Sequence, residues 1–227
     1  MEHRKNRDNE DILKAKYPKL YDAIFTNSTT LNSQILLSSL FIMSFEAMQD
    51  YVVDRFQEFF CHDFEFGKDG KVIYKESDQF AAIKEKFRQQ YQVLSNKFMG
   101  LNTKRVSLFQ AACAWLHEIE CFNENDIRLI LAIIQVRNQL THELFQWLLD
   151  DQQPYLVKGM VYSLLNLYFK ASNWWIREYE ASIFPENFTQ YSEEDMTSAA
   201  AANVFVLHAL LDKCFPTSSA DSSNKNE

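Results

Sequence analysis

Apolar residues recur along most of this chain at spacings of one, three and four, which is the repeat of a helix face. Gly and Pro are rare, with four of each, and most stand between these stretches. The pattern predicts an all-α helical bundle of about seven helices, over about 18–25, 29–62, 77–100, 103–121, 123–153, 155–184 and 192–215. The helix over 29–62 is apolar on several sides, so we expect it at the centre of the fold.

One internal segment departs from the helical repeat. Residues 64–75 read FEFGKDGKVIYK, two short alternating runs around Gly67-Lys68-Asp69-Gly70, which predicts a small β-hairpin inserted near 64–75. The ends 1–10 and 217–227 are polar and are expected to be disordered. No repeat or long linker interrupts the rest, so residues 11–216 are predicted to form a single helical domain.

Composition narrows the classes of function. A net charge of −8 argues against a protein that coats nucleic acid through bulk positive charge, although a local basic groove is compatible with it. The four Cys have no metal-ligand spacing and are expected to be reduced thiols. The most apolar run, 35–45, is broken by serines and is too short for a membrane span, which takes about 20 residues. These features predict a cytoplasmic location.

The predicted helix over 123–153 carries an unusual set of polar residues. On a helical wheel, Arg137 and Asn138 fall inside a broad apolar sector, and His142 lies at its edge. An uncompensated buried guanidinium costs several kcal/mol or more, so Arg137 must meet a carboxylate, line a cleft or face another subunit. One interpretation is structural: a buried bridge from Arg137 to Glu46, which stands in an apolar stretch, with His142 as a hydrogen-bonded edge residue.

Arg137-Asn138-x-x-x-His142 also resembles the signature of the HEPN superfamily, an Arg followed after four to six residues by His, often with Asn directly after the Arg. The segment around Glu46 is similar to a Phe/Trp-Glu segment on an early helix of several HEPN groups. The position two residues after the His, a modified Tyr in some HEPN toxins, is Leu144 here. Control by modification at that position is therefore not expected.

The resemblance implies a metal-independent endoribonuclease without a cofactor, acting at a composite site between two copies of the chain. In it, His142 is the general acid or base, Arg137 holds the scissile phosphate, and Asn138 and Glu46 support them. It implies a role in a toxin–antitoxin system, abortive infection or phage defence, with an RNA substrate and an antitoxin or activating protein as a further partner. The alternatives are a catalytically silent HEPN-like module that binds RNA, a nucleotide or a protein, and a plain scaffold with Arg137 sealed against Glu46.

Two other groups of residues have competing interpretations. A set of basic residues could form a groove for RNA or an ordinary solvated face: Lys84, Lys86, Arg88, Lys97, Lys104 and Arg105. Trp174 and Trp175 could stack on bases, but their helical spacing favours packing in the core.

Overall fold

The computed structural model describes residues 28–68, 72–76, 107–149 and 153–215, with single positions before residue 28 and between 81 and 92. Side chains are described for 32–60, 67–68, 107–142 and 158–215, and at those single positions. The predictions for 1–10, 217–227 and the helix over 18–25, and most of the helix over 77–100, fall outside the described residues.

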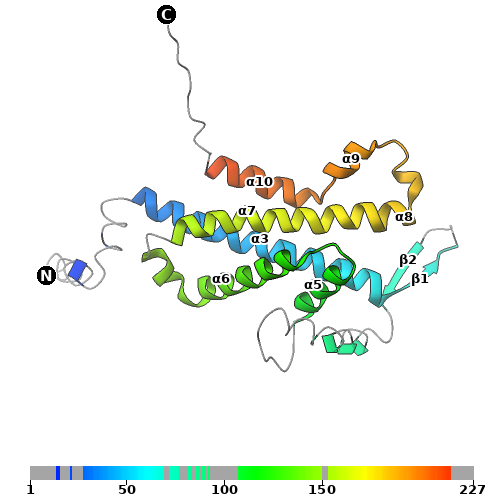
Figure 1. Cartoon of the computed structure of the whole chain (residues 1–227), viewed down its shortest axis with the longest axis horizontal. Coiled ribbons are helices and arrows are strands. Elements are labelled where there is room, and N and C mark those ends of the chain that lie inside the picture. Colours follow the sequence, from blue (N-terminus) through cyan, green and yellow to red (C-terminus); the bar gives the residue numbers. More distant parts are fainter. Residues whose placement is uncertain are drawn as a thin grey trace, which may run out of the picture.

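Helices dominate the described part of the chain, which confirms the all-α class (Figure 1). The longer helices are α3 (Ser28–Cys61), α5 (Leu108–Glu118), α6 (Glu124–Leu149), α7 (Gln153–Trp174) and α10 (Ala202–Cys214). Short elements join or extend them: the π-helical segment η1 (Trp175–Glu180), α8 (Ala181–Ile183), the 3₁₀ turn η2 (Pro185–Asn187) and α9 (Glu193–Ser198).

The long helix α3 lies at the centre of the fold and contacts α5, α6, α7 and α10 (Figure 1). Its inward side chains include Phe41 and Phe56, both fully buried, together with Leu40 and Met48. They join one continuous apolar core with residues of the other long helices. An apolar surface on several sides is what a central helix needs, because each neighbour covers only part of it.

The structure corrects our estimate of the apolar length of α3. The sequence predicts that the most apolar run ends at residue 45, but the helix continues with further apolar residues: Val52, Val53, Phe56 and Phe59. Over Asn32–Phe60 it is long and apolar enough to cross a membrane by length and composition, and 44% of the 18-residue window that meets this criterion is buried inside the structure. A core helix passes the same test, so the location of the protein stays a prediction.

A two-stranded antiparallel sheet follows α3 directly, in the segment where the sequence predicts a hairpin. Strand β1 (His62–Phe66) pairs with β2 (Val72–Glu76), with Phe64 opposite Tyr74. The sheet extends from the end of the bundle where α3 ends (Figure 1).

The predicted helix over 192–215 is wrong in one respect, because it is broken into α9 and α10. Its beginning is as expected: Ser192 caps α9 and forms a capping box with Asp195. The backbone is extended at Ala199, after which the chain turns into α10. The side-chain amide of Asn173 on α7 donates to the carbonyl oxygens of Met196 at 2.7 Å and Ala199 at 2.8 Å. Asn173, a residue distant in sequence, therefore supplies hydrogen bonds that help to end α9.

Replacing Asn173 by alanine is expected to lower the free energy of unfolding by about 2 kcal/mol, because the two carbonyls would lose their donor in a half-buried place. Urea unfolding followed by circular dichroism measures the change. Asn187→Ala is the matched control, since Asn187 is exposed and its side chain makes no hydrogen bond to the described residues. Equal midpoints for wild type and Asn173→Ala would contradict this role.

The buried cysteines of the core predict a loss of stability at alkaline pH. Burial raises the pKa of the Cys121 thiol to about 12, with the charge of Lys170 opposing it, and burial also raises the pKa of Cys113. An unfolded thiol ionises near pH 8.5, so the stabilisation is complete below that pH and is lost as the pH rises toward the folded pKa. We expect a loss of about 2 kcal/mol per thiol at pH 10 relative to pH 8. Urea unfolding at both pH values tests this. In Cys113→Ala, the difference in the free energy of unfolding between pH 8 and pH 10 should be smaller.

Candidate functional site

Helix α6 holds the motif residues, and its beginning is fixed by local hydrogen bonds. The Asn123 side chain accepts from the backbone N–H groups of Asn125 at 2.9 Å and Asp126 at 3.0 Å. The Asp126 carboxylate accepts from the N–H of Asn123 and from Lys170 on α7, which ties α6 to its neighbour. From this start, one face of α6 is buried against the bundle through Ile127, Ile130, Ile133, Val136 and Leu140.

Arg137 stands at the edge of that buried face and contacts α3. Its Nη2 donates to Glu46 Oε1 at 2.8 Å, and its Nη1 donates to Asn138 Oδ1 at a longer 3.4 Å. The guanidinium carbon lies 5.7 Å from the ring centroid of Phe45, within the range of a cation–π contact. The Nε atom is buried without a hydrogen-bond partner in the described part of the chain. The guanidinium is thus held in place by residues of α3.

The pair is open to solvent on one side. The Arg137 side chain is 32% exposed and the Glu46 side chain 39% exposed. If the protein were a plain scaffold, we would expect this ion pair to be closed off from solvent, and it is not. Nη1 has only the long bond to Asn138, so it remains a donor for a group that arrives from solvent.

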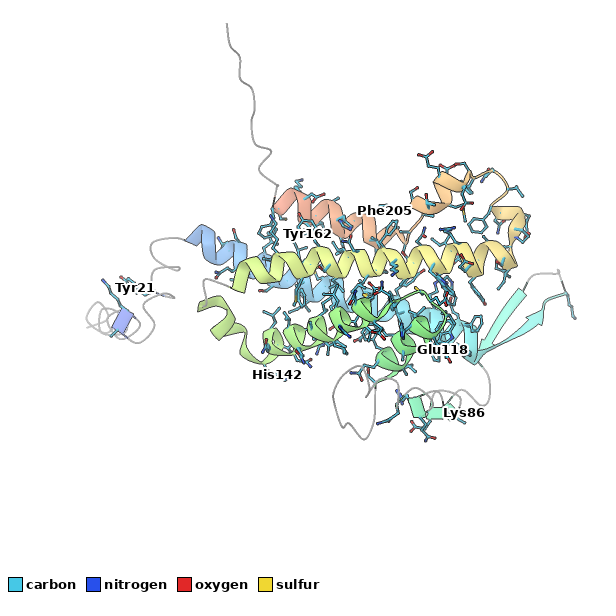
Figure 2. The ribbon with its side chains drawn as sticks, viewed as in Figure 1. Tyr21, Lys86, Glu118, His142, Tyr162 and Phe205 are labelled. Atoms are coloured by element: carbon cyan, nitrogen blue, oxygen red, sulfur yellow. The ribbon has the colours of Figure 1, made fainter. Side chains whose placement is uncertain are left out.

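His142 lies one turn beyond Asn138 and is exposed. Figure 2 places it at the outer edge of the molecule, on the side of α6 away from α7. No hydrogen bond joins it to a described residue, unlike the edge histidine of the structural interpretation. Arg137 and His142 are five positions apart, so their directions from the helix axis differ by about 140°. Asn138 is exposed as well, and no bond between it and His142 is present.

Comparisons with family models, curated proteins and solved structures find no match. The HEPN resemblance therefore rests on the motif and its surroundings in this chain.

An exposed apolar stripe on α3 is a feature of the site that sequence reasoning did not single out. Ile35, Leu36 and Met43 are 45%, 42% and 53% exposed. Because each residue turns an α-helix by about 100°, these three side chains leave the axis of α3 within about 80° of the direction of Glu46. The stripe therefore runs from the Arg137–Glu46 pair toward the beginning of α3. Only the burial pattern distinguishes these residues from the other apolar residues of this helix.

The other predicted groups are resolved in part. Of the six basic residues, only Lys86, which is exposed, and Arg88, which pairs with Glu85 at 3.5 Å, lie among the described residues (Figure 2). Trp175 is 2% exposed and packs against Tyr179, and Trp174 packs edge-on against Trp115. The packing interpretation of the two tryptophans is confirmed. Among the described residues, no group of His, Cys, Asp and Glu side chains is placed to hold a metal ion.

Proposed function

We propose that this protein is a metal-independent endoribonuclease of the HEPN type, and that it acts as a homodimer. The observation that carries the proposal is the state of Arg137. Its guanidinium is fixed by Glu46, keeps a third of its side chain open to solvent, and shares a helix with the exposed His142 in the order Arg-Asn-x-x-x-His. A positioned cation and a free imidazole are the two groups that cleavage of RNA by its own 2′-hydroxyl requires.

A composite site between two copies is supported by the geometry of one copy. Arg137 and His142 diverge around α6, so one helix does not aim both side chains at one phosphate. A second α6 across a two-fold axis would supply the missing partner for each. The exposed stripe of Ile35, Leu36 and Met43 offers a partly apolar face beside the site, which suits a self-complementary dimer interface.

In the proposed cleavage, one proton is removed from the attacking hydroxyl and one proton is given to the leaving oxygen. His142 takes the proton of the RNA 2′-hydroxyl, whose oxygen attacks the adjacent phosphorus. The bond from phosphorus to the 5′-oxygen of the next nucleotide breaks, and His142 of the partner subunit gives that oxygen a proton. Arg137 binds the phosphate oxygens on which negative charge develops, and Asn138 orients the phosphate or the imidazole. The products are a 2′,3′-cyclic phosphate and a 5′-hydroxyl.

The biological role we propose comes from the resemblance alone. HEPN ribonucleases act in toxin–antitoxin systems, abortive infection and phage defence, and the chain is proposed to act in the cytoplasm in one of these settings. An antitoxin or an activating protein would be its regulatory partner. Because RNA must approach a chain of net charge −8, a local basic surface is part of the proposal.

A second candidate function is a catalytically silent HEPN-like module that binds RNA, a nucleotide or a protein. The ion pair favours it, because Glu46 already neutralises the charge of Arg137 at 2.8 Å. In that case Arg137 would be structural, and His142 would have no role in chemistry.

Incubation of the purified protein with cellular RNA in EDTA tests the proposal. We expect cleavage without added metal, products that end in 2′,3′-cyclic phosphate, and no cleavage of single-stranded DNA of the same sequence, because DNA lacks the nucleophile. Cleavage of DNA, or 3′-hydroxyl ends, would contradict the mechanism. Binding of RNA by a folded dimer that cleaves nothing would favour the silent module.

A further inference from the structure

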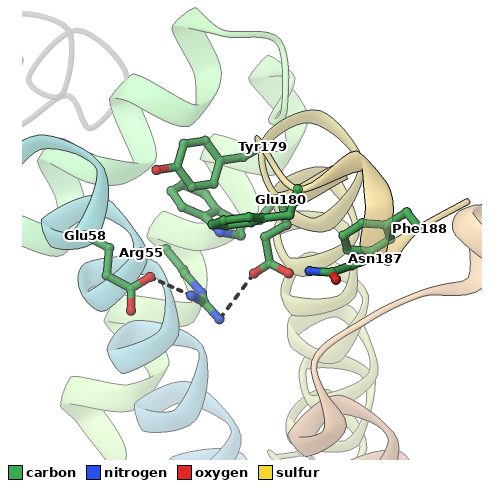
Figure 3. A pocket seen from close by; sticks show the side chains of 8 residues that line it. Arg55, Glu58, Tyr179, Glu180, Asn187 and Phe188 are labelled. Carbon is green, nitrogen blue, oxygen red and sulfur yellow. Dashed lines mark hydrogen bonds and ion pairs between the residues drawn. The ribbon is translucent and has the colours of Figure 1, made fainter. Parts of the chain in front are cut away.

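A pocket of about 230 Å³ lies on the other side of α3 from the Arg137–Glu46 pair. It is lined by residues of α3 and of the segment from η1 to just after η2: Arg55, Glu58, Trp175, Tyr179, Glu180, Phe184, Asn187 and Phe188 (Figure 3). Arg55 is nine residues after Glu46, which is about half a turn around α3 and about 13 Å along it. The pocket is therefore separate from the proposed nuclease site.

The π-helical segment η1 shapes one wall of this pocket. In an α-helix, Glu180 would point about 140° away from Trp175, since each residue turns by about 100°. In η1 the N–H of Ala181 bonds to the carbonyl of Ile176, five residues back, so a single turn holds an additional residue. That turn brings Trp175, Tyr179 and Glu180 to the same side. Such segments cost stability in a helix and are frequent at functional sites.

The charges in the pocket leave a carboxylate in excess. Arg55 lies between Glu58 and Glu180 and pairs with both, the second at 3.5 Å (Figure 3). Each carboxylate uses one oxygen for Arg55, and its other oxygen has no partner among the described residues. The two acids and one base give a formal charge of −1 in a recess, where surrounding protein strengthens the field. An anion such as a phosphate is repelled there.

Aromatic rings complete the lining and favour a flat cation. Trp175, Tyr179, Phe184 and Phe188 surround the charged row. The pocket already holds one guanidinium in this way, since that of Arg55 lies 5.9 Å from the Trp175 ring centroid, between the two carboxylates. A guanidinium offers N–H donors in one plane for carboxylate oxygens and stacks on aromatic faces.

We propose that this pocket binds a small organic cation with a guanidinium group. The free oxygens of Glu58 and Glu180 accept its N–H groups, and the rings of Tyr179 and Phe188 cover its faces. The side-chain amide of Asn187, which has no hydrogen bond to the described residues, lies at the same pocket and adds a polar contact.

Calorimetric titration with agmatine tests this proposal. We expect binding with a Kd of about 1 mM or tighter, weaker binding of putrescine, which has an amine in place of the guanidinium, and no binding of AMP. Glu180→Gln should weaken agmatine binding about tenfold or more. Phe188→Ala should weaken it severalfold without a change of charge. Glu186→Gln is the matched control, since Glu186 is exposed, lies outside the pocket and carries the same charge, and it should bind within about twofold of wild type.

Three results would overturn the proposal: no binding of agmatine up to about 10 mM by protein with an unchanged circular dichroism spectrum, equal affinity for putrescine, or equal losses in Glu180→Gln and Glu186→Gln. RNA cleavage does not enter this measurement, so its outcome is independent of the proposed nuclease.

Discussion

Replacing His142 by alanine is expected to lower the rate of RNA cleavage by about 10²–10⁴-fold, the usual contribution of general acid–base catalysis. The imidazole is exposed and has no hydrogen bond to the described residues, so the free energy of unfolding should change by less than about 0.5 kcal/mol. In a composite site both copies lose their imidazole at once. Single-turnover cleavage of a labelled RNA, with unfolding curves for both proteins, measures the two effects separately.

His208→Ala is the matched control for this experiment. His208 is half-buried on α10, far along the sequence from the motif, and its loss should leave the cleavage rate within about twofold. Mixed dimers sharpen the test. A dimer of one wild-type chain and one His142→Ala chain lacks one of the two imidazoles that the mechanism uses, so its cleavage rate should also fall by about 10²-fold or more. Full activity of His142→Ala would remove His142 from the mechanism.

Replacing Arg137 by lysine is expected to lower the cleavage rate by about 10²–10³-fold, because an ammonium cannot reproduce the planar donors that bind a phosphate. Lysine keeps the positive charge next to Glu46, so stability should fall by no more than about 1 kcal/mol. The contrast between a large loss of rate and a small loss of stability distinguishes a catalytic Arg137 from a structural one. Arg137→Ala does not make this distinction, since it leaves Glu46 without its partner.

Arg128→Lys is the control for the arginine prediction. Arg128 lies on the same helix, is 69% exposed and pairs with Glu124 at 3.6 Å. It should leave both rate and stability close to wild type. Parallel losses of rate and stability in Arg137→Lys would favour the structural interpretation and the silent-module candidate.

Much of the helical arrangement was predictable from local signals. The sequence predicts the central helix over 29–62, and α3 spans Ser28–Cys61. The beginnings of α6 and α9 depend on local signals, because a capping residue such as Asn123 or Ser192 acts on a backbone within three positions of itself. The pairing of Arg137 with Glu46 was also foreseeable as one interpretation, since a charge in an apolar sector needs a partner.

The errors arose where distant residues decided the outcome. The apolar repeat continues from α9 into α10 without a Gly or Pro, so nothing local indicates the break at Ala199. Its carbonyl instead bonds to Asn173, which is 26 positions earlier in the chain. The π-helical turn of η1 has no signal in its residues either, and it shapes one wall of the pocket beside Arg55.

The sequence by itself determined that this chain forms long helices and that Arg137 falls on the apolar side of one of them, because helical periodicity and capping act over a few residues. Only the tertiary structure decided which carboxylate meets Arg137, how much of the pair stays exposed, and that His142 stands free at the edge of the molecule. These are properties of how helices distant in sequence pack together. The pattern of residue types along one helix does not predict how close that helix lies to another.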